Sequence, residues 1–88
     1  MTRQESEKRI QDRVNTVQKY TDPGKDIEEL IASAIWQLQV GTPGLEVVET
    51  YTAAQVIIRD TTTGTEKTYL IGTIEKNGRF EVRINEVK

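Results

Sequence analysis

The sequence predicts an α+β fold: an N-terminal helix and an amphipathic helix packed on an antiparallel meander of three strands, or four if the first strand divides. Three observations favour this fold. Residues 3–40 repeat apolar side chains at helical spacing, residues 45–87 are rich in Val, Ile, Thr and Tyr, and short glycine-containing turns separate the strand segments. Because the helical segments precede all the strands, their order favours helices packed on an antiparallel sheet.

Composition limits the functions that the chain can have. Its 88 residues amount to one domain, 30% of them are charged, and the net charge is −2. The two halves of the chain carry the same balance of charges, so neither has the positive excess typical of nucleic-acid binding. Cysteine and histidine are absent, which removes the usual nucleophile–base pairs and nearly all transition-metal sites. We therefore expect a protein that is not an enzyme and uses no cofactor and no metal.

Residues 3–20 are predicted to form a polar helix with a thin apolar seam. Thr2 and Glu5 fit a capping box at its start. The seam consists of Ile10, Val14 and Val17, with Tyr20 continuing the line. So narrow a seam buries little by itself, and two interpretations stay open: a loosely docked helix, or a helix that pairs with a partner chain. We divide the chain into this helix, residues 1–21, and a helix-plus-sheet domain, residues 22–88.

The second helix is predicted from Asp22, as N-cap, to about Val40, with Pro23 at its first position and Gly41 as its terminator. Its core face is a continuous apolar stripe of Ile27, Leu30, Ile31, Ala34, Ile35 and Leu38. Acidic residues near its start stabilise the positive end of the helix dipole, which explains them without a metal ion.

A second, narrower apolar ridge lies on the opposite side of this helix. Trp36 is almost opposite Ile27, Val40 follows one turn later, and Ala32 extends the line backwards. Two interpretations are possible. The seam of residues 3–20 covers the ridge, or the ridge contacts another protein; both hold if the first helix is exchanged between subunits.

The remaining sequence predicts the strands. Residues 45–60 are long for one straight strand, and a bend or bulge is expected at residues 50–54. Residues 61–64 form a turn whose register stays open, and further strands are expected at residues 66–75 and 79–87. The turn lacks the lysine and the following helix of a phosphate-binding loop.

The last hairpin could have a loop of two residues or three. We predict the three-residue loop 76–78, because it places Ile74 opposite Phe80 and Glu75 opposite Arg79 instead of pairing apolar with charged residues. The inner face of the hairpin would then carry Leu70, Ile74, Phe80, Val82 and Ile84. Its outer face would carry Tyr69, Ile71, Thr73, Glu81, Arg83 and Asn85.

These patterns favour a small, non-enzymatic protein-interaction module that associates with itself as a homodimer. The candidate partner-binding residues are Trp36, Val40, Tyr69 and Ile71. The alternative is a nucleic-acid-associated or regulatory accessory protein that uses basic residues of the sheet, Lys76, Arg79 and Arg83. Glutamates are interleaved with these basic residues, which disfavours that function. No apolar run has transmembrane length and the N-terminus is too charged for a signal peptide, so we expect a cytoplasmic protein with no membrane partner.

Overall fold

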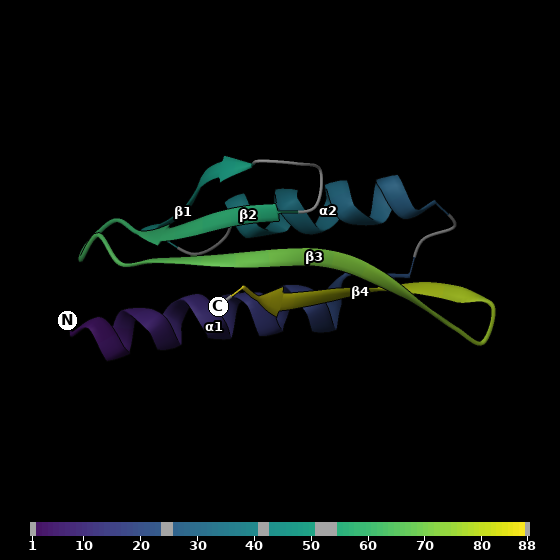
Figure 1. Ribbon diagram of the computed structural model, residues 1–88, viewed down its shortest axis with the longest axis horizontal. Coiled ribbons are helices and arrows are strands. Elements are labelled where there is room, and N and C mark those ends of the chain that lie inside the picture. Colours follow the sequence, from purple (N-terminus) through teal and green to yellow (C-terminus); the bar gives the residue numbers. More distant parts are fainter. Residues whose placement is uncertain (1, 24–25, 41–42, 51–54, 88) are drawn as a thin grey trace.

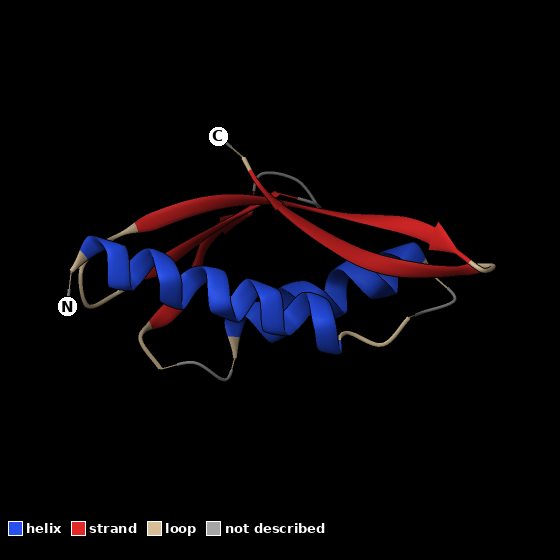
Figure 2. Ribbon diagram, turned by 90° about the horizontal axis from the view of Figure 1, so that it is seen from below, coloured by secondary structure: helices blue, strands red, loops and turns tan. Residues whose placement is uncertain are grey.

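The computed structural model describes residues 2–23, 26–40, 43–50 and 55–87 of the chain. Its elements are α1 (Arg3–Tyr20), α2 (Ile27–Gln39), β1 (Leu45–Thr50), β2 (Gln55–Asp60), β3 (Glu66–Lys76) and β4 (Arg79–Glu86). The strands form one antiparallel sheet in the order β1-β2-β3-β4 (Figure 1). Both helices lie against one face of this sheet (Figure 2). The predicted α+β fold is confirmed, in its four-stranded form.

The first helix forms as predicted and docks on its own chain. Thr2 accepts a hydrogen bond from the Glu5 N–H at 3.2 Å, and the Glu5 carboxylate accepts one from the Thr2 N–H at 3.4 Å, which completes the capping box. The seam residues Ile10, Val14 and Val17 are buried in the core. Tyr20 does not continue the seam, because it is 65% exposed.

The second helix begins later than predicted. Its N-cap is Asp26, whose carboxylate accepts the Glu28 N–H at 2.9 Å, and Asp22 and Pro23 precede the helix. The prediction of Asp22 as N-cap is therefore wrong. Both aspartates suit a cap, and only the chain path decides which one meets a free helix N–H. The predicted terminator, Gly41, lies outside the described residues.

The core face of α2 is the predicted stripe with one exception. Leu30, Ala34 and Leu38 are buried, and Ile31 and Ile35 pack against the core from its margin. Ile27, in the first turn, is exposed instead.

The predicted long strand divides into β1 and β2. The expected bend at residues 50–54 falls largely outside the described residues; the described irregularity is a register shift between Val47 and Glu49. The turn at residues 61–64 forms as predicted, and its register is now defined by Arg59 opposite Glu66 and by an Asp60 N–H to Thr65 carbonyl bond of 2.8 Å.

The β3–β4 hairpin has a two-residue loop, so the predicted three-residue loop is wrong. Lys76 faces Arg79, and the loop residues Asn77 and Gly78 have φ angles of 54° and 77°. Two successive positive φ angles define a type I′ turn, whose twist matches that of the flanking strands and which Asn-Gly strongly favours. This turn preference outweighs the pairing of Ile74 with Glu81 and of Glu75 with Phe80.

This one-residue shift reverses the two faces of β3 relative to the prediction. Tyr69 and Ile71 point into the core and are fully buried, whereas Leu70 is 48% and Ile74 38% exposed on the opposite face. The faces of β4 are as predicted, because Val82 and Ile84 are buried and Phe80 packs against the core.

Polar side chains of α1 form hydrogen bonds and an ion pair with the sheet and with α2. Arg9 forms an ion pair with Asp60 at 3.1 Å, and Gln11 accepts a hydrogen bond from the Tyr69 hydroxyl at 2.9 Å. Arg13 donates to the carbonyls of Gln37 and Val40 at the end of α2. Cations near the end of a helix satisfy its last carbonyls and interact favourably with its dipole.

Candidate protein-interaction surfaces

The α2 ridge, which we define as Ala32, Trp36 and Val40, is a solvent-exposed line of apolar side chains. Trp36 is 63% and Val40 39% exposed. The ridge is continuous with a shallow hollow of about 290 Å³ lined by Glu28, Ile31, Ala32 and Ile35. Because α1 directs its seam into the core, it does not cover Trp36, and the interpretation that the seam covers the ridge is wrong.

Tyr69 and Ile71 do not lie on a surface, so they cannot form the patch that the sequence suggested. The Tyr69 ring is enclosed in the core, where burial raises the pKa of its hydroxyl. The Lys67 ammonium lies 5.9 Å from the centre of the Tyr69 ring and 2.6 Å from the Glu86 carboxylate. Burial tends to lower the pKa of Lys67, but its contacts with Glu86 and Tyr69 outweigh burial and raise it.

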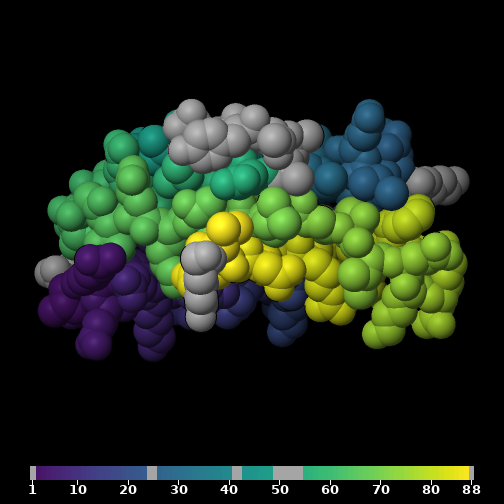
Figure 3. All heavy atoms as spheres, viewed as in Figure 1, coloured from purple at the N-terminus to yellow at the C-terminus, as the bar shows by residue number. Residues whose placement is uncertain are grey.

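The outer face of the sheet is turned away from both helices. The apolar residues of β3 that it exposes are not Tyr69 and Ile71 but two others. Leu70 and Ile74 are exposed there, on either side of Gly72 in the sequence of β3. Figure 3 looks onto this side of the molecule, where β3 (green) runs across the middle. Charged residues occupy part of this face: Arg59 pairs with Glu66 at 2.8 Å and with Glu46 at 3.4 Å. The sequence missed Leu70 and Ile74 as surface residues, because their assignment depended on the hairpin register.

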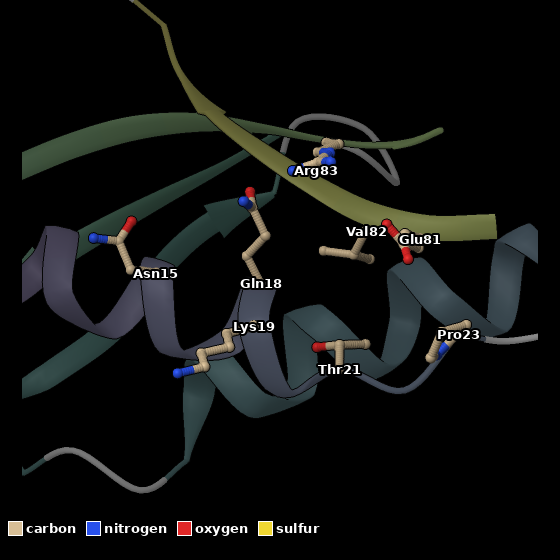
Figure 4. Close-up of a pocket in the computed structure, with 8 residues that line it drawn as sticks. All are labelled: Asn15, Gln18, Lys19, Thr21, Pro23, Glu81, Val82 and Arg83. Carbon is tan, nitrogen blue, oxygen red and sulfur yellow. The ribbon is translucent and has the colours of Figure 1, made fainter. Parts of the chain in front are cut away.

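The free edge of β4 borders a groove of about 410 Å³ (Figure 4). Its lining residues come from the end of α1, the following loop and β4: Asn15, Gln18, Lys19, Thr21, Pro23, Glu81, Val82 and Arg83. Gln18 extends from α1 towards the strand, and its side-chain carbonyl accepts the Ile84 N–H at 2.7 Å.

That bond identifies which main-chain groups of β4 face outward. The Ile84 N–H points away from β3, and main-chain groups of a strand alternate in direction, so Val82 and Phe80 also point their N–H and C=O groups to the free edge. Within the described part of the chain, Gln18 is the one side chain that bonds an N–H of this edge. By contrast, the opposite edge strand, β1, is interrupted by its register shift.

The basic candidates lie at the hairpin tip and on the outer face. The two-residue loop brings Lys76 directly opposite Arg79, and Arg83 lies further along β4. All three side chains are exposed, and none forms an ion pair with a described side chain. Glu81 separates Arg79 from Arg83 on the same face.

The environment of Asp60 lowers the pKa of its carboxyl group. Its side chain is fully buried, which raises the pKa, but the Thr62 N–H, the Ser6 hydroxyl and the Arg9 guanidinium stabilise the charge and hold the pKa below its ordinary value of 3.8. These partners fix the turn at residues 61–64 to α1, and this is a structural role.

Among the described residues, no three carboxylates gather in a group that could hold a metal ion. None of the helices in the described ranges is long and apolar enough to cross a membrane. Comparison of the chain with protein-family models, with curated proteins and with solved structures gave no match.

Proposed function

We propose that this chain is a small, non-enzymatic protein-interaction module that associates with itself and presents the α2 ridge to a protein partner. The observation that carries the proposal is Trp36, which is 63% exposed beside Val40 on a helix whose other side supplies the core. Tryptophan buries a large apolar area when covered, and it is enriched among the residues that dominate binding energy at interfaces.

The residue types of the chain agree with a binding role. The sequence has no histidine and no cysteine, and the buried carboxylate, Asp60, is committed to Arg9. The exposed apolar residues Leu70 and Ile74 add a further apolar surface on the sheet.

Self-association is tested by the solution mass of the full chain, measured by light scattering over a wide concentration range. We expect a dimer that dissociates on dilution. A monomeric mass at every concentration would contradict self-association.

The ridge is tested by comparing proteins captured by the full chain with those captured by two variants. Trp36→Ala removes the ridge side chain, and Tyr20→Ala removes a comparably exposed aromatic ring on α1. We expect the first variant to lose a captured protein that the second retains, with equal melting temperatures for both. Capture that is unchanged by Trp36→Ala would exclude the ridge as the contact.

A second candidate function is nucleic-acid association through the hairpin tip. The observation that favours it is the cross-strand pair of Lys76 and Arg79, exposed and without ion pairs to described side chains. Binding of this kind weakens steeply with added salt, because phosphate contacts release counterions. Affinity for a nucleic acid that falls with salt and falls further in Arg79→Ala supports this function, and the absence of binding at low salt refutes it.

A further inference from the structure

We propose that two copies of this chain join through the free edges of their β4 strands, antiparallel and with Val82 opposite its own counterpart, to make one continuous sheet. This inference rests on the self-association proposed above and names the surface that performs it. The main-chain groups needed are already oriented, since Val82 and Phe80 point their N–H and C=O groups out of the sheet.

The side chains of β4 are complementary to themselves in this register. On the outer face, Glu81 of each copy lies opposite Arg83 of the other, so that the contact contains a charge pair on each side of the two-fold axis. On the inner face, Phe80 lies opposite Ile84, and Val82 opposite Val82. Glu81 and Arg83 therefore meet a charge of opposite sign, and Phe80, Val82 and Ile84 meet apolar residues.

Neighbouring registers lose this complementarity. Moving the two-fold axis to Glu81 places the two Glu81 carboxylates opposite each other and pairs Arg79 with Arg83. Moving it to Arg83 places the two guanidinium groups opposite each other. Like charges directly opposite one another destabilise a strand pair, so the charge pattern selects the register centred on Val82.

The edge is also accessible. The groove of about 410 Å³ runs beside Val82, where the end of α1 and the following loop leave room next to the strand. Gln18 bonds the Ile84 N–H, but none of the described residues bonds the outward Val82 groups or the Phe80 N–H, which a second strand could therefore reach. Natural proteins commonly protect an edge strand from pairing with another chain by a bulge, and β1 has such a register shift. The pairing of β4 with β3 continues without one.

The charge pattern supplies the test. In the full chain, Glu81→Arg or Arg83→Glu alone converts both symmetry-related charge pairs into like-charge pairs, and we expect each to weaken the dimer about tenfold or more. The double variant, Glu81→Arg with Arg83→Glu, restores opposite charges and is expected to restore dimerisation. An equal mixture of the two single variants is expected to form a heterodimer more readily than either variant forms a homodimer.

The outcomes separate this inference from the proposed function. If the full chain dimerises but the charge variants dimerise equally well, the β4 interface is wrong and self-association stands. Trp36→Ala is the matched variant at the ridge and should leave the dimer intact; dissociation by that change would assign the contact to α2. If the full chain is monomeric at every concentration, the β4 interface and self-association both fail. Circular dichroism and melting of each variant show that it is folded, and rescue in the mixture is a result that misfolded chains would not give.

Discussion

Asp60 shows how a single side chain joins the two layers of the molecule. Its carboxylate, fully buried at the end of β2, pairs with Arg9 of α1 and accepts the Thr62 N–H at 3.0 Å. We expect Asp60→Asn to destabilise the protein at neutral pH by about 1.5–3 kcal/mol, the range for a hydrogen bond to a charged group. The lower end applies, because the Arg9 side chain is 30% exposed and solvent screens the pair.

The destabilisation caused by Asp60→Asn should be largest near neutral pH and should decrease in acid. Since the pKa of Asp60 is lower in the folded protein than its ordinary value of 3.8, the stabilisation is fully present above that pH and is lost as the pH falls through the folded pKa. Denaturant unfolding of the unaltered protein and of Asp60→Asn, from neutral pH to below pH 3.8, measures the stabilisation at each pH. The difference in free energy of unfolding should shrink only in the acid range. A matched substitution, Glu66→Gln, removes an exposed partner of Arg59 and should cost far less at any pH.

The sequence did not predict this site. Asp60 precedes three threonines and a glycine, and that pattern indicates a turn irrespective of what the carboxylate contacts. Its partner Arg9 is 51 residues away in the chain, and no local period connects the two. Contacts of this kind depend on where α1 crosses the sheet.

At the scale of single elements, the sequence predicted α1 and the faces of β4 correctly, and it failed for β3. In β4, apolar residues occupy one side alone, so alternation identifies the buried face. In β3, both faces carry apolar residues: Leu70 and Ile74 on one, Tyr69 and Ile71 on the other. Alternation therefore cannot identify which face is buried. The preference of Asn77-Gly78 for a type I′ turn sets the hairpin register instead. This preference outweighs the less favourable pairing of the side chains that face each other across the two strands.

Gln18 stabilises α1 on the sheet and also blocks one N–H of the β4 edge. We therefore expect Gln18→Ala to change two properties in opposite directions. The free energy of unfolding of the monomer should fall by about 0.5–1.5 kcal/mol, because one hydrogen bond is lost. Self-association should strengthen, because the Ile84 N–H becomes free to bond the Phe80 carbonyl of a second copy.

Dilute thermal melting and concentration-dependent light scattering measure these two effects separately. Asn15→Ala is a suitable control, since Asn15 lines the same groove but bonds Gln11 instead of β4. Weaker association of folded Gln18→Ala protein would contradict the role of the β4 edge, because at that edge the change removes a competitor for the Ile84 N–H.

For the molecule as a whole, the order and type of elements could be predicted because the helices carry a helical period and the strand segments are rich in Val, Ile, Thr and Tyr between turns. The way in which the layers meet could not. The thin seam of α1 was compatible with loose docking or with a partner chain. The structure instead places Ile10, Val14 and Val17 in one core with α2 and the sheet, and the polar contacts of Arg9, Gln11 and Gln18 add to that attachment.

The chain should therefore unfold as one cooperative unit that includes α1. Ile10→Ala leaves a cavity where a fully buried side chain stood, and we expect it to lower the free energy of unfolding by about 2–5 kcal/mol. Hydrogen exchange of amides in both α1 and β3 should accelerate together, because loss of the α1 seam opens the shared core. Lys8→Ala, an exposed neighbour on the same helix, should leave exchange unchanged. Faster exchange confined to α1, with β3 still protected, would instead show that the helix detaches independently of the sheet.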